Sequence, residues 1–115
     1  MRTENTNYSK EVAETILQQL GGRRFIMMTG AHHFSYYVNE NGNTVLKFKI
    51  EESKSLINTV LIEYNPLDLY NMHFLQVSVK QDFTFFSKTV LSHSNVYCDQ
   101  LEELFTDATG LYTRL

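Results

Sequence analysis

The chain has 115 residues, of which 43% are hydrophobic and 20% are charged, so it can bury a core and is expected to form one α+β domain over residues 1–115. Ten Lys and Arg residues against thirteen Asp and Glu residues give a net charge of −3, which speaks against nucleic-acid binding by bulk electrostatics. The composition excludes collagen, coiled coils, disulfide-stabilised scaffolds and wholly disordered chains. Residues 1–8 are expected to be flexible.

The single cysteine, Cys98, excludes an internal disulfide and indicates a reducing compartment. The amino terminus is polar and lacks the apolar stretch of a signal peptide. Apolar runs are also far shorter than the roughly 20 residues of a membrane-spanning helix. We therefore expect a cytoplasmic protein, with no cofactor and no membrane partner.

The first helix is predicted over residues 10–20, because Ile16, Leu17 and Leu20 share one face at helical spacing. Gly21-Gly22 then supplies the backbone freedom that ends a helix. The nearly continuous apolar run 24–29 predicts a buried strand. On this interpretation Gly21–Arg24 is a helix C-cap and not a phosphate-binding loop, since no helix follows it.

Five further segments have the apolar patterns or the turn boundaries of strands. The pair Asn41-Gly42 predicts a hairpin turn after the first of them, and Asn65-Pro66-Leu67-Asp68 predicts another turn. A polar turn is expected over residues 51–55. The predicted strands cover residues 32–38, 46–50, 60–64, 70–79 and 83–91.

A second helix is predicted over residues 96–109, started by Ser94 or Asn95 and ended by Gly110. Its apolar stripe comprises Tyr97, Leu101, Leu104, Phe105 and Ala108. The order of elements predicts an α+β fold, an antiparallel sheet of about five or six strands flanked by an N-terminal and a C-terminal helix, with the helices packed on one face.

The sequence contains no recognisable catalytic constellation. The four histidines lack metal-ligand spacing, and His32 and His33 should point to opposite faces of a strand, so no metal site is predicted. Cys98 lies beside the predicted apolar stripe and is interpreted as a small core thiol and not as a nucleophile. A small enzyme is the least favoured of three functional hypotheses.

A nucleic-acid-binding module is the second hypothesis. It would use Lys47, Lys49, Lys80 and Lys88 on the sheet, although solvated lysines are the simpler interpretation. The aromatic set Phe83, Phe85 and Phe86 fits base stacking and core packing equally well. The acidic side of the second helix fits a solvated face better than a mimic of phosphates.

Several spaced blocks resemble a family of short uncharacterised proteins carried by bacteriophages and other mobile elements. The opening block is Leu20-Gly21-Gly22-x-x-Phe25-x-x-Met28-Thr29-Gly30-Ala31, and the closing block is Phe105-Thr106-x-x-Thr109-Gly110-Leu111-Tyr112. Between them, Leu46-x-Phe48-x-Ile50 and Asp68-Leu69-Tyr70 are similar to later blocks of the family. The resemblance implies a similar length and a helix–strands–helix order, and it supplies no catalytic residues to carry over. The Arg23-Arg24 pair departs from the family pattern, which expects a smaller or amide side chain at one position.

The leading hypothesis is a small non-enzymatic accessory protein of a phage or mobile element that binds a protein partner, or itself as a dimer. The absence of catalytic constellations and the family resemblance motivate it. A recognition surface is expected near turns and near amphipathic tyrosines, at Arg23, Arg24, Thr29, Asp68, Tyr70 and Tyr112.

Overall fold

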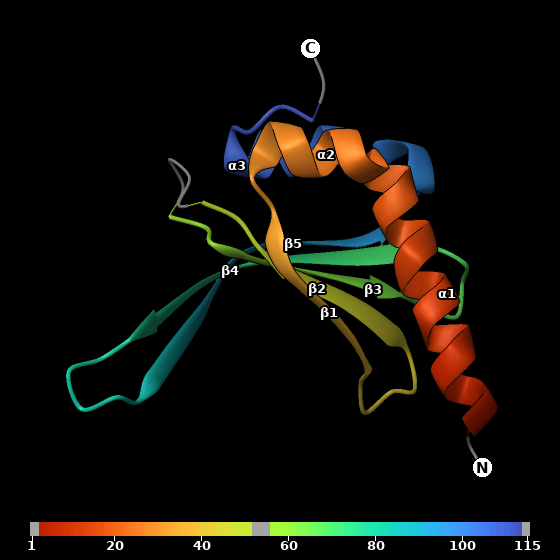
Figure 1. Cartoon of the computed structure of the whole chain (residues 1–115), viewed down its shortest axis with the longest axis horizontal. Helices are drawn as coiled ribbons and strands as arrows, with labels where there is room; N and C mark the ends of the chain where they lie inside the picture. Colours follow the sequence, from red (N-terminus) through yellow and green to blue (C-terminus); the bar gives the residue numbers. More distant parts are fainter. Residues whose placement is uncertain (1–2, 52–55, 114–115) are drawn as a thin grey trace.

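The computed structural model describes residues 3–51 and 56–113. Two consecutive helices precede five strands, and a short 3₁₀ turn leads into the last helix (Figure 1). The elements in chain order are α1 (Thr3–Leu20), α2 (Gly22–Thr29), β1 (His32–Val38), β2 (Thr44–Lys49), β3 (Thr59–Tyr64), β4 (Tyr70–Val79), β5 (Phe85–Val96), η1 (Cys98–Gln100) and α3 (Leu101–Thr109).

The strands form one antiparallel sheet in the order β1-β2-β3-β4-β5, so each strand pairs with its neighbours in sequence. The predicted Asn-Gly turn joins β1 to β2, with Gly42 at a φ of 81°. The α+β class, the antiparallel sheet and the flanking helices are therefore confirmed, with five strands. Residues 52–55 of the predicted polar turn lie outside the described residues.

All three helices pack on one face of the sheet (Figure 1). The core between the layers centres on Phe48 of β2, which is fully buried against Phe25 of α2 and Phe105 of α3. The opposite face of the sheet, called the open face below, carries Lys47, Lys49 and the other alternate residues of each strand. None of the helices within residues 3–51 and 56–113 is long and apolar enough to cross a membrane.

The run 24–29 was predicted to be a strand, and this prediction is wrong: the segment is helix α2. Gly22, Phe25 and Thr29 are buried at spacings of three and four, while Met27 between them is 77% exposed. Arg and Met are also good helix formers. Gly21 therefore joins two helices, and the statement that no helix follows Gly21-Gly22 is wrong as well.

The carboxyl-terminal helix is shorter than predicted, because β5 continues to Val96 and α3 begins at Leu101. Val96 is buried and pairs with Tyr70 of β4. Tyr97 is exposed, so its assignment to the apolar stripe is wrong. Gly110 ends α3 in the left-handed conformation, as predicted.

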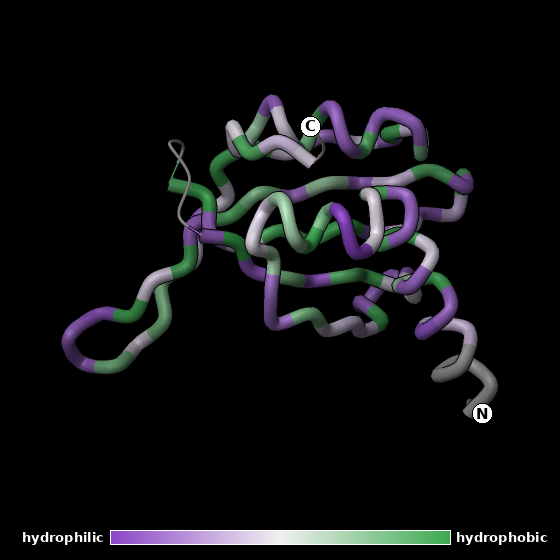
Figure 2. Tube along the Cα trace, turned by 45° about the horizontal axis from the view of Figure 1, so that its top comes forward, coloured by the Kyte–Doolittle hydropathy of each residue, from purple (hydrophilic) through white to green (hydrophobic). Residues whose placement is uncertain are grey.

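The β4–β5 hairpin extends beyond the rest of the sheet. After the pair Thr59–Leu75 the register of β3 with β4 ends, and β4 continues with β5 alone. We call this projection, residues 76–89, the arm. Figures 1 and 2 show it leaving the body of the molecule, with hydrophobic stretches along both strands and a hydrophilic tip.

Candidate functional site

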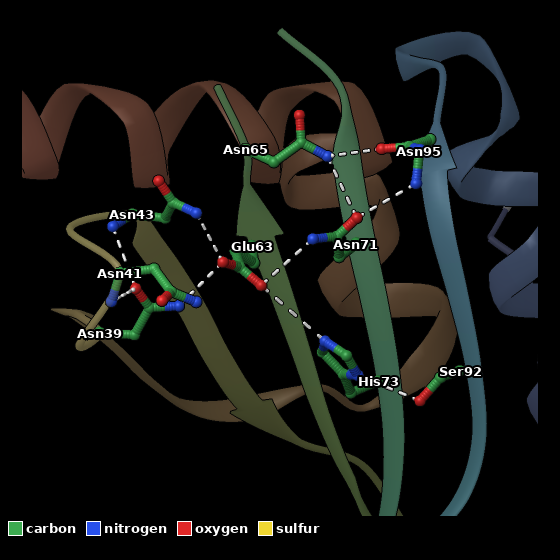
Figure 3. A network of polar contacts seen from close by, with 9 residues as sticks. All are labelled: Asn39, Asn41, Asn43, Glu63, Asn65, Asn71, His73, Ser92 and Asn95. Atoms are coloured by element: carbon green, nitrogen blue, oxygen red, sulfur yellow. Dashed lines mark hydrogen bonds and ion pairs between the residues drawn. The ribbon is translucent and has the colours of Figure 1, made fainter. Parts of the chain in front are cut away.

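A polar network on the open face converges on Glu63 of β3, a residue with only 8% of its surface exposed (Figure 3). Its Oε2 accepts hydrogen bonds from Nδ2 of Asn39 at 2.8 Å and of Asn43 at 2.7 Å. Its Oε1 accepts one from Nδ2 of Asn71 at 3.3 Å and lies 3.9 Å from Nε2 of His73. Three amides and an imidazole thus surround one carboxylate.

Backbone hydrogen bonds fix the orientation of two of these amides. Oδ1 of Asn39 accepts from the backbone N–H groups of Asn41 and Asn43, both at 3.0 Å. Oδ1 of Asn71 accepts from the backbone N–H of Asn95 at 3.1 Å. With their oxygens engaged in this way, these amides present their NH₂ groups to the carboxylate.

Burial by itself raises the pKa of the Glu63 carboxyl, but the hydrogen bonds from Asn43, Asn39 and Asn71 and the nearby His73 outweigh it. The net result is a pKa below the ordinary value of 4.5. Glu63 is therefore ionised at neutral pH. Because its oxygens already accept hydrogen bonds from these donors, it is poorly suited to act as a general base. The network ties the β1–β2 turn to β3 and β4, and its role is structural.

The six residues predicted for recognition do not form one surface. Thr29 and Tyr70 are buried. Oγ1 of Thr29 donates to the carbonyl of Phe25 at 2.7 Å and accepts from the N–H of Ala31, so it closes the end of α2. The Tyr70 hydroxyl donates to Oε1 of Gln19 at 2.7 Å and joins the sheet to α1. These two side chains hold the fold together.

The other predicted residues lie in two regions, along α3 and beside α1. Nη2 of Arg24 in α2 lies 3.9 Å from Oε1 of Glu102 in α3, and Arg23 is exposed. Tyr112 lines a shallow acidic hollow of about 380 Å³ along α3, together with Asp99, Glu102, Glu103, Thr106, Asp107 and Thr113. Asp68 and Tyr70 both line another hollow of about 290 Å³ beside α1, together with Tyr64. Neither hollow gathers the groups of a catalytic site.

Asp68 provides a testable electrostatic feature. The Tyr64 hydroxyl donates a hydrogen bond to Oδ1 of Asp68, which, with burial and the carboxylate charge, raises the pKa of Tyr64 to about 12. Asp68→Asn should lower that pKa toward 10, because the negative charge is removed while Asn tolerates the φ of 65° at this turn. Ultraviolet difference titration would measure the shift, with Tyr64→Phe as the control that assigns the signal. Ionisation of the wild-type Tyr64 near pH 10 would contradict the hydrogen bond.

The positions of His32, His33 and Cys98 differ from those predicted from the sequence. A bulge between His32 and Ser35 places the rings of His32 and His33 in contact, with centroids 4.8 Å apart, although opposite faces were predicted. Among the described residues no three metal-ligating side chains cluster. Cys98 is exposed, so its assignment to the core is wrong.

The four lysines of the nucleic-acid hypothesis are divided between two faces. Lys47 and Lys49 pair with Leu61 and Thr59 on the open face. Lys88 pairs with Gln76 in the arm, on the face that continues the helix-covered side of the sheet. Lys80 lies with its Nζ 5.6 Å from the centre of the Phe86 ring. Nucleic-acid binding by these residues stays a prediction. The four lysines do not share one surface that would support it.

The arm and its base carry a set of exposed apolar side chains on both faces of the hairpin: Val79 and Phe85 pair on one face, and Phe86 lies on the other. Phe83 is 83% exposed and Phe85 is 79% exposed, and the remaining members are half-exposed. The possibility that the three phenylalanines pack in the core is therefore wrong. The set comprises Val79, Phe83, Phe85 and Phe86 in the arm, with Val90 and Leu91 at its base.

Hydrogen bonds fix the arm at its base and at its tip. At its base the Asn58 side chain exchanges two hydrogen bonds with the backbone of Val77, at 2.8 and 2.9 Å. At its tip Oδ1 of Asp82 accepts from both the N–H and the hydroxyl of Thr84. The arm thus presents its apolar side chains on an ordered scaffold.

Phe83 adopts a left-handed backbone conformation with a φ of 68°. A bulky side chain disfavours this region by about 1–2 kcal/mol, whereas Gly occupies it freely. Folding alone would favour Gly or Asn at this turn. An exposed aromatic residue in an unfavourable conformation points to a role outside the fold.

Sequence reasoning named the arm phenylalanines but could not choose between core and surface. The signal that could have found them is the length of the β4–β5 segments, which exceeds that of β3 and leaves their far ends without a third strand.

Comparisons of the chain with protein-family models, curated proteins and solved structures find no match.

Proposed function

We propose that this protein is a small non-enzymatic binding protein that associates with another protein through its arm. The observation that carries the proposal is the exposed apolar set at Val79, Phe83, Phe85 and Phe86 on an ordered projection. This agrees with the accessory role expected from the resemblance to phage and mobile-element proteins.

The hydrophobic effect favours association of the arm with a partner that covers its apolar side chains. Transfer of apolar surface out of water is favourable by about 25 cal/mol per Å², so several exposed phenylalanines form a strong driving force for association. Large apolar patches on soluble proteins mark contact surfaces. The unfavourable backbone of Phe83 fits the same function, because binding would use the aromatic ring that the turn accommodates poorly.

Charge favours a protein partner over a nucleic acid at this surface. The arm carries Lys80 and Lys88 against Asp82, which leaves too little positive charge for strong phosphate contacts. Lys47 and Lys49 lie on the open face and do not reinforce the face that bears Lys88. Apolar contact is therefore the stronger term.

The variant Phe83→Gly tests the proposal because it separates binding from folding. Gly relieves the positive φ, so the free energy of unfolding should stay unchanged or rise by up to about 1 kcal/mol. Loss of the ring should weaken association at least about tenfold, as for an aromatic residue central to an interface. Association would be measured by sedimentation of the purified chain and by capture of proteins from a lysate of the cells in which it occurs.

Met27→Ala is the matched control, since Met27 is 77% exposed on α2 and lies outside the arm. It should retain the association that Phe83→Gly loses. If wild type associates neither with itself nor with any captured protein in a way that Phe83→Gly reduces, the proposal is wrong.

A further inference from the structure

We propose that the partner of the arm is a second copy of this chain, joined by antiparallel pairing of the two β5 strands about a two-fold axis at Ser87. This inference rests on the proposed binding role of the arm and specifies its occupant. In the resulting dimer the two hairpins form a four-stranded ribbon.

The first argument is the free edge of β5. The strand order places β5 at one side of the sheet, where, within residues 3–51 and 56–113, β4 is the one strand that pairs with it. From Phe85 to Thr89 the register with β4 is regular, running from the pair Val79–Phe85 to the pair Leu75–Thr89. A straight edge with outward-directed backbone N–H and C=O groups is a template for another strand.

The opposite edge of the sheet is less suited to pairing. In β1 the register shifts between His32 and Ser35, and His33 has a φ of 56°. Such a bulge interrupts an edge and is a known means of blocking strand addition. β5 has register shifts as well, between Thr89 and Leu91 and between His93 and Val96, but both lie outside the regular stretch Phe85–Thr89. Pairing of β1 with β5 of another copy would moreover continue without closing, whereas pairing of β5 with β5 closes as a dimer.

The second argument is the self-complementarity of the β5 sequence around Ser87. With the axis at Ser87, Phe86 lies opposite Lys88 of the second copy, and Phe85 lies opposite its Thr89. One face of the ribbon thus joins an aromatic ring to a cation, and the other joins an aromatic ring to a β-branched residue.

The contact of Lys80 with the Phe86 ring shows that this ring already receives an ammonium group, at 5.6 Å. A second cation at the same ring, supplied by Lys88 of the other copy, extends the interaction. An axis at Lys88 would instead place two ammonium groups opposite each other, which is destabilising. An axis at Phe86 would leave Lys88 opposite Thr84 and without an aromatic partner.

Cross-linking at the axis tests the register. In a Cys98→Ser background, Ser87→Cys would place two thiols across an antiparallel pair, where Cα atoms are about 4.5–5.5 Å apart and a disulfide can form. We expect a covalent dimer on mild oxidation, detected by non-reducing electrophoresis. The matched control is Ser78→Cys, on β4 of the same arm, which should remain monomeric because two strands separate it from its copy. Equal cross-linking of both variants would overturn the assigned axis.

A charge reversal provides a second measurement without cysteine. Lys88→Glu places a carboxylate against the aromatic ring of the other copy on both sides of the axis, so the dimer dissociation constant should rise by about tenfold. Lys47→Glu, an equivalent reversal on the open face, should leave the constant unchanged. Sedimentation equilibrium over a concentration series would measure both, and equal effects of the two reversals would overturn the pairing.

The inference and the proposed function fail in different ways. A wild-type chain that is monomeric at all concentrations, with no preferential cross-linking of Ser87→Cys, overturns the second-copy inference. Capture of another protein that Phe83→Gly abolishes would then still support the binding role of the arm. If Phe83→Gly affects neither self-association nor capture, both are overturned.

Discussion

Replacement of Phe48 by Ala is expected to lower the free energy of unfolding by about 3–5 kcal/mol, the usual cost of removing a buried phenylalanine ring. Phe48 is fully buried and its ring contacts three others, with centroids 5.5 Å from Phe25, 5.2 Å from Phe34 and 6.4 Å from Phe105. These contacts join β1, β2, α2 and α3. This loss is a large part of the total free energy of unfolding, which is roughly 5–15 kcal/mol for a typical domain.

Urea denaturation followed by circular dichroism would measure the effect. Phe48→Leu keeps most of the volume and should cost about 1–1.5 kcal/mol. Phe85→Ala, at a ring that is 79% exposed, should change the stability of the monomer by less than about 0.5 kcal/mol. A loss below about 1 kcal/mol for Phe48→Ala would contradict the packing of the helices on β2.

Glu63→Gln is expected to destabilise the fold by about 2–3 kcal/mol at neutral pH, although it changes one oxygen to an NH₂ group. The amides of Asn39, Asn43 and Asn71 all donate to the carboxylate. A Gln side chain must direct its own NH₂ at one of these donor groups. The oxygens of Asn39 and Asn71 accept from backbone N–H groups, so these two amides cannot turn without further loss.

The effect of Glu63 should depend on pH with a defined sign. Its pKa is lower in the folded chain than the ordinary 4.5, so the carboxylate stabilises the fold above that value. The stabilisation is lost as the pH falls below 4.5 through the folded pKa. The difference in unfolding free energy between wild type and Glu63→Gln should therefore shrink on acidification. A difference that stays constant from pH 7 to pH 3 would show that the carboxylate charge is not what the amides bind.

The strands and turns were well predicted because their signals are local. Alternation of Leu46 and Phe48 with Lys47 and Lys49 places one face toward the core, and Gly42 permits the positive φ of the turn before them. Gly110 ends α3 for the same local reason. Such features depend on residues adjacent in sequence, and no distant contact is needed to set them.

The error at residues 24–29 came from treating an apolar run as a strand when its burial is helical. The chain in fact carries one pattern twice, Phe25-x-x-x-Thr29-Gly30 and Phe105-x-x-x-Thr109-Gly110. In both cases the Thr hydroxyl donates to the Phe carbonyl and the Gly is left-handed. Because the second copy was predicted as a helix end, its repetition was the signal that could have corrected the first.

By itself the sequence determined the α+β class, the order of the elements other than α2 and most turn positions, because these follow from hydrophobic period and backbone preference. Only the tertiary structure decided what lies at the surface. It brings Asn39 and Asn43 of the β1–β2 turn and Asn71 of β4 around Glu63, and it leaves Phe83 and Phe85 exposed because β3 ends before the arm begins. The local sequence around an apolar strand residue is the same whether other elements cover the residue or leave it exposed. Its burial therefore depends on tertiary contacts that no local pattern contains.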